Sequence, residues 1–131
     1  MESRDVLLLG VRGETLGNLS IDSSIEEKFQ NKTLRPIIKL QNDLFIEVFI
    51  NYAIKQKSVF FSLSPEKKIA YIENVIQRDI KFRNSLKGMI IAFFTIDEYS
   101  EYITNSSSLN KRMMNILIER LKSQVQLLEI I

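Results

Sequence analysis

One stretch decides the fold class: TLRPIIKLQNDLFIEVFINYAIK, residues 33–55. Its polar side chains recur every four residues, beginning at Lys39 and Asp43, while large apolar side chains fill the broad opposite face. This period is typical of an amphipathic α-helix that buries a wide stripe. Thr33 can cap the first turn, and Pro36 falls where a missing amide costs little. The sequence therefore predicts a helix of about 24 residues here.

Capping signals recur on both sides of this stretch. Ser24 is followed by Glu27, and Thr95 by Glu98, the spacing at which a hydroxyl and a carboxylate satisfy the free amides of a first turn. Ser64 precedes a proline, which suits the first helical position. Four further helical segments are expected. They cover residues 25–32, 65–94 (one helix, or two joined near residues 78–81), 96–103 and 109–129.

These segments predict an all-α protein, a single bundle of four to five helices. The bundle domain is expected over residues 23–131, and an irregular N-terminal arm over residues 1–22. No internal repeat or linker interrupts the bundle.

The expected arm contains glycines after an apolar run, in VLLLGVRGETLGN, residues 6–18. Gly10, Gly13 and Gly17 do not form the G-x-G core of a dinucleotide-binding loop, and no Lys-Ser or Lys-Thr follows Gly17. Because no parallel sheet is predicted behind them, we expect no phosphate site here. The apolar residues 6–9 are expected to pack on the bundle or on a second subunit.

Two absences from the composition limit the chemistry. The 131 residues contain no Cys and no His, which removes disulfides, thiolate nucleophiles, serine–histidine triads and histidine-based metal sites. We therefore expect no catalytic residues, no cofactor and no metal ion, and a protein that is not an enzyme. Since no secretory signal or membrane-spanning run is visible, a cytoplasmic location without membrane contact is expected.

The last expected helix has a seam of apolar residues at alternating spacings of four and three. This spacing is typical of helix pairing. The seam consists of Met114, Ile118, Leu121, Val125 and Leu128. Either it packs inside one chain or it forms a subunit interface, and the apolar ending LLEII favours a partner. The leading hypothesis is a helical interaction protein that self-associates through this helix.

Basic side chains suggest an alternative, a nucleic-acid-binding helical module. The candidate phosphate contacts are Arg78, Lys81, Arg83, Lys87 and Arg112. A second basic group consists of Lys111, Arg112, Arg120 and Lys122. Because the net charge is only +2, solvated helix faces are the competing interpretation.

Acidic side chains suggest a third hypothesis, a small-molecule enzyme that uses carboxylates. Asp97, Glu98 and Glu101 cluster at the start of one predicted helix, where they could act as acid and base or bind a hard cation. The competing interpretation is that they complement the helix dipole.

The chain resembles a group of small uncharacterised bacterial proteins. The resemblance covers residues 29–121 and rests on TLRPIIKLQNDLFIEVF, FRNSLKGMIIAFFTIDEYSEYI and LNKRMMNILIERL. Some similar chains carry a glyoxalase label, which implies βαβββ modules and a metal bound through His and Glu. The sequence does not support that label because it contains no His and no strands in that order. The resemblance therefore assigns no residue a role.

Overall fold

The computed structural model describes residues 3–13, 15, 17 and 23–130. Its α-helices are α1 (Arg4–Arg12), α2 (Ile25–Phe29), α3 (Arg35–Leu40), α4 (Asn42–Lys55), α5 (Pro65–Arg78), α6 (Ile80–Ile91), α7 (Ile96–Thr104) and α8 (Ser106–Ser123). A π-helix, η1 (Gln30–Leu34), joins α2 to α3, and two 3-10 turns are η2 (Val59–Ser62) and η3 (Val125–Leu127). The described residues include no strand.

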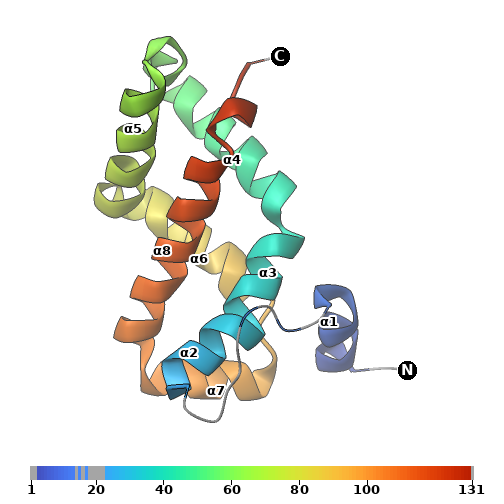
Figure 1. Cartoon of the computed structure of the whole chain (residues 1–131). Helices are drawn as coiled ribbons and strands as arrows, with labels where there is room; N and C mark the ends of the chain where they lie inside the picture. Colours follow the sequence, from blue (N-terminus) through green and yellow to red (C-terminus); the bar gives the residue numbers. More distant parts are fainter. Residues whose placement is uncertain (1–2, 14, 16, 18–22, 131) are drawn as a thin grey trace.

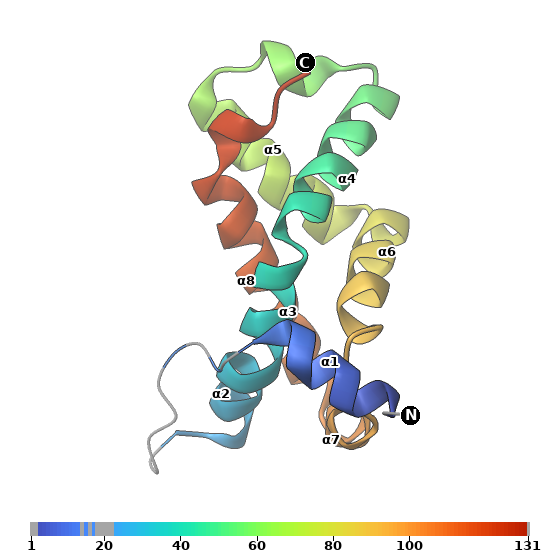
Figure 2. The same ribbon diagram turned by 90° about the vertical axis from the view of Figure 1, so that its right-hand side faces the viewer.

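The all-α prediction is confirmed, but the number of helices is larger than expected. Since α2, η1 and α3 run into one another, the described residues form seven helices rather than four or five. Figures 1 and 2 show α8 among α4, α5 and α6, with α2, α7 and α1 gathered at one end. None of the described helices is both long enough and apolar enough to span a bilayer.

The core is built from the apolar stripes that the helical periods predict. Phe45 and Phe49 of α4 are 1% exposed, and Ile72 and Ile76 of α5 are fully buried. Phe49 lies at the centre of a ring cluster, with centroid distances of 5.2 to 6.3 Å to its neighbours. This packing fixes α4 and α5 against each other.

The long helix expected over residues 33–55 is interrupted twice. Its first residues, Thr33 and Leu34, end the π-helix, and α3 stops at Gln41 before α4 begins. The Gln41 side chain is nearly buried and donates a hydrogen bond of 2.7 Å to the Met89 carbonyl of α6. This side-chain contact ties the break between α3 and α4 to α6.

Residues 65–94 form two helices, which meet at Asp79. The Asp79 carboxylate accepts a hydrogen bond from the Phe82 amide and caps α6, and it accepts another, at 2.7 Å, from the Tyr52 hydroxyl. The Tyr52 bond is the main cause that lowers the pKa of Asp79. Burial, together with that carboxylate, raises the pKa of Tyr52, so the hydroxyl remains a donor.

We expect Asp79→Ala to lower the free energy of unfolding by about 1–2 kcal/mol, because α6 loses its cap and Tyr52 loses its acceptor. Asp79→Asn keeps an oxygen at the same place and is expected to lose less than half as much. Urea denaturation of both variants measures the difference. Equal losses would contradict this account of the break.

The N-terminal arm is not irregular as expected, because residues 4–12 form α1. Ser3 caps the helix, and Gly13 ends it with a φ of 79°, a conformation that favours glycine. Figure 2 shows α1 lying across the α7 end of the molecule. The Arg4 guanidinium donates hydrogen bonds to the carbonyls of Ala92 and Phe94, which anchors the start of α1.

Candidate nucleic-acid interface

The fold does not keep the two predicted groups of basic residues as separate surfaces. Five of them line grooves beside α8, namely Arg83, Lys87, Lys111, Arg112 and Arg120. Arg78 and Lys81 are exposed and line neither groove. Lys122 instead forms ion pairs with Glu73 at 3.2 Å and Glu119 at 3.4 Å.

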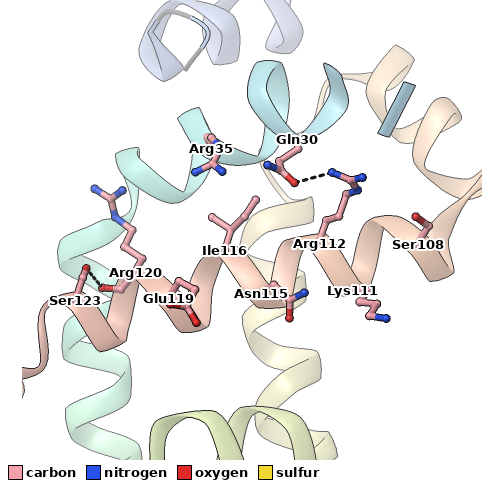
Figure 3. A pocket seen from close by; sticks show the side chains of 10 residues that line it. All are labelled: Gln30, Arg35, Ser108, Lys111, Arg112, Asn115, Ile116, Glu119, Arg120 and Ser123. Carbon is pink, nitrogen blue, oxygen red and sulfur yellow. Dashed lines mark hydrogen bonds between the residues drawn. The ribbon is translucent and has the colours of Figure 1, made fainter. Parts of the chain in front are cut away.

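The larger groove, here called the α3–α8 groove, has a volume of about 740 Å³. Arg112 and Arg120 line it from α8, and Arg35 lines it from α3. Figure 3 shows Arg112 and Arg120 pointing from α8 toward η1 and α3, with Ile116 between them. Arg35 lies on the opposite wall of the groove. The guanidinium groups of the three arginines therefore surround the apolar side chain of Ile116.

Each of these three arginines is positioned by a neutral amide. The three hydrogen bonds are Arg112 to Gln30 at 2.9 Å, Arg35 Nε to Asn31 Oδ1 at 2.9 Å, and Arg120 Nε to Asn42 Oδ1 at 2.8 Å. An amide oxygen orients a guanidinium group but brings no negative charge. The arrangement therefore holds the side chains in place without neutralising them.

No carboxylate of the described residues forms an ion pair with Arg35, Arg112 or Arg120. Glu119 lines the groove, but its carboxylate reaches Lys122. The pKa of Glu26 is lowered, chiefly by a backbone hydrogen bond and to a smaller extent by the charge of Arg112, although the two form no ion pair. Among the described residues, the groove thus keeps three positive charges that pair with no carboxylate, an arrangement that suits oxyanions such as phosphate, whose oxygens accept paired N–H donors.

The π-helix supplies two of the amides. Gln30 and Asn31 are its first residues, and the Asn31 side chain also lies against Gly17. A π-helix has poorer backbone geometry than an α-helix and occurs often at functional sites. Here the Gln30 side chain lines the α3–α8 groove beside Arg112, whereas the Asn31 side chain lines an adjoining hollow that Arg35 and Glu27 also line.

The second groove, here called the α6–α8 groove, lies on the other flank of α8 and has a volume of about 430 Å³. Arg83 and Lys87 line it from α6, and Lys111 lines it from α8. None of the described residues that line it carries a carboxylate. Lys111 and Asn115 border both grooves, so the two basic surfaces are continuous across α8.

The three acidic candidates line a separate cavity of about 590 Å³. Both oxygens of Glu98 are already bonded there, at 2.6 and 2.8 Å to Arg12 and at 2.6 Å to the Thr33 hydroxyl. Burial alone would raise the pKa of Glu98, but these bonds and one from the Thr95 amide hold it below its ordinary value. The carboxylate is therefore a structural partner of α1. No group of three or more acidic side chains among the described residues could hold a metal ion.

The apolar seam predicted on one helix over residues 109–129 lies largely inside the chain, but α8 ends at Ser123, so Val125 belongs to η3 and Leu128 follows it. Met114, Ile118, Leu121 and Leu128 are at most 7% exposed, and Val125 is partly buried against the same core. Their burial therefore favours packing within one chain over a subunit interface. A surface for a partner must come from other residues.

Arg35 is a groove residue that sequence reasoning missed. It follows Leu34 in a stretch interpreted as an amphipathic helix, and its distance from Arg112 in the chain gives no hint of proximity. The sequence indicates only that the segment of Arg35 and the segment of Arg112 both contain basic residues.

The comparisons add no relative from which a role could be transferred. No family model, no curated protein and no solved structure matches the chain.

Proposed function

We propose that this protein is a helical module that binds nucleic acid through its phosphate backbone. The observation that carries the proposal is the set of three arginines in the α3–α8 groove, each oriented by a neutral amide and none paired with a described carboxylate. Oriented guanidinium groups bind phosphate oxygens by paired hydrogen bonds. Lys111, Arg83 and Lys87 extend the positive surface into the α6–α8 groove.

The modest net charge of +2 does not oppose this proposal. Binding depends on the local potential, and cations that line a concave surface focus it. Within the part of the chain that the structure describes, the two grooves together are lined by six basic side chains and one carboxylate, that of Glu119. This local excess supports binding to a polyanion.

The test is the affinity for labelled DNA, measured by fluorescence anisotropy at fixed salt. We expect Arg112→Gln/Arg120→Gln to weaken binding by about tenfold or more, because two phosphate contacts are lost. Arg112→Lys/Arg120→Lys keeps the charge but loses the paired hydrogen bonds of the guanidinium groups, so it should weaken binding less than the glutamine variant does and still bind less tightly than the wild type. Lys55→Gln/Lys67→Gln removes the same charge outside both grooves and serves as the matched control.

Thermal denaturation establishes that each variant is folded. Failure of the wild type to bind any of single-stranded DNA, duplex DNA and duplex RNA would overturn the proposal. Equal affinity of the groove variant and the control variant would overturn it as well.

We propose self-association as a second candidate function, favoured by the surface of α1. Arg4 and Arg12 of this helix form hydrogen bonds with the rest of the chain. The apolar side chains of Val6, Leu7, Leu9 and Val11 are instead each more than half exposed. Exposed apolar residues of this kind favour contact with a second copy.

Light scattering is expected to show a mass that rises with concentration for the wild type. Leu7→Glu/Val11→Glu should remain a monomer, because charges on that face oppose its burial. A wild type that stays monomeric over the same range rejects this candidate.

A further inference from the structure

We propose that α8 is the element that enters the major groove of duplex DNA. The inference rests on the proposed function and names its substrate class. It starts from the shape of α8, whose exposed side chains follow one row at a spacing of four residues. The row consists of Ser107, Lys111, Asn115, Glu119 and Ser123.

This row forms a ridge between two hollows. The α3–α8 groove lies on one flank and the α6–α8 groove on the other, and Lys111 and Asn115 border both. Figure 3 shows Lys111, Asn115 and Glu119 pointing away from α8 on the side opposite to Arg112 and Arg120. With 18 residues, α8 is about 27 Å long. A helix of this kind, about 10–12 Å across, fits a B-form major groove about 12 Å wide.

The charges on the two flanks match the borders of that groove. A major groove runs between two phosphate backbones, so a helix placed in it needs cations on both sides. Arg35, Arg112 and Arg120 lie on one flank of α8, and Arg83 and Lys87 lie on the other. A single strand would need cations along one path only.

The lining residues also argue against other nucleic acids. No aromatic side chain lines either groove, whereas proteins that bind single strands rely on stacking of bases on aromatic rings. The major groove of A-form RNA is too deep and narrow for side chains to read. Duplex DNA is therefore the substrate that the two grooves and their ridge fit.

The ridge carries side chains that can contact base edges. Asn115 lies at its middle and is exposed, and an asparagine amide can pair with both the N6 and N7 positions of adenine. Lys111 can donate to guanine, and Glu119 can accept from cytosine. The flanking arginines position the protein, and the ridge supplies sequence preference.

The experiment compares a DNA duplex of about 20 base pairs, the RNA duplex of the same sequence and the DNA single strand at equal ionic strength. We expect the DNA duplex to bind at least about tenfold more tightly than the other two. In selection from a randomised duplex pool, the wild type should show a base preference that Asn115→Ala loses, with no change in salt dependence. Asn51→Ala, on the exposed side of α4, is the control.

The outcomes separate this inference from the proposed function. Equal or tighter binding of the single strand or the RNA duplex overturns the placement of α8 and leaves the proposed function standing. A base preference unchanged by Asn115→Ala also overturns the placement. Binding to none of the three overturns both.

Discussion

Glu98→Ala is expected to lower the free energy of unfolding by about 3–5 kcal/mol, because it leaves the Arg12 guanidinium buried without a negative charge beside it, with only the carbonyls of Lys32 and Phe93 to accept its hydrogen bonds. The Arg12 side chain is only 2% exposed, and Glu98 accepts hydrogen bonds from both of its terminal nitrogens. The same change removes the acceptor of the Thr33 hydroxyl and one half of the capping box that begins α7. Urea denaturation followed by circular dichroism measures the loss.

Two comparisons make this expectation specific. Glu101→Ala removes an exposed carboxylate from the same helix and should change stability by less than about 0.5 kcal/mol. Arg12→Met/Glu98→Ala leaves no buried charge, so it should be more stable than Glu98→Ala by about 1 kcal/mol or more. A Glu98→Ala variant as stable as Glu101→Ala would show that α1 is not anchored by this pair.

Phe49→Ala is expected to lower the free energy of unfolding by about 3–5 kcal/mol through the cavity that it leaves. The ring is 1% exposed and contacts four other rings, those of Tyr52, Phe60, Tyr71 and Phe82. Its neighbours belong to three helical segments besides its own, so no single side-chain shift fills the space. Denaturant unfolding provides the value.

Leu44→Ala is the matched control on the same helix. That side chain is 51% exposed, and its truncation should cost less than about 1 kcal/mol. Similar losses for the two variants would contradict the position of Phe49 at the centre of the core.

The helices could be predicted where local signals decide them. Ser24, Ser64 and Thr95 cap helices as the sequence indicates, and the full capping box at Thr95 is present. The sequence does not decide whether residues 65–94 form one helix or two, and the structure has two because Asp79 caps a new helix. The outcome depends on a hydrogen bond to Tyr52, 27 residues away, which no local pattern contains.

The start of α8, at the serines before Leu109, also could not be predicted from the local sequence. The sequence predicts a last helix that begins at Leu109, yet Ser106 and the two residues after it form the first turn of α8. Serine is tolerated at helix starts as well as in turns. The choice between the two was made by packing of α8 against α5 and α6, which the sequence does not display.

The candidate site was predictable only in part. Positive charge on α6 and α8 is visible in the sequence, and it indicated a nucleic-acid-binding surface that stays a proposal. Arg35 and the amides of Gln30 and Asn31 could not be found, because the π-helix that presents them has no known sequence pattern here. Likewise, Arg12 and Glu98 are 86 residues apart and meet only once α1 docks.

The salt dependence of DNA binding tests the central claim, that the arginines of the α3–α8 groove contact phosphates. The logarithm of the association constant is measured against the logarithm of salt concentration for the wild type and for Arg112→Gln/Arg120→Gln. Because each lost phosphate contact reduces the slope by about 0.9, the variant's slope should be shallower by about 1.8. A variant slope equal to that of the wild type would contradict the claim.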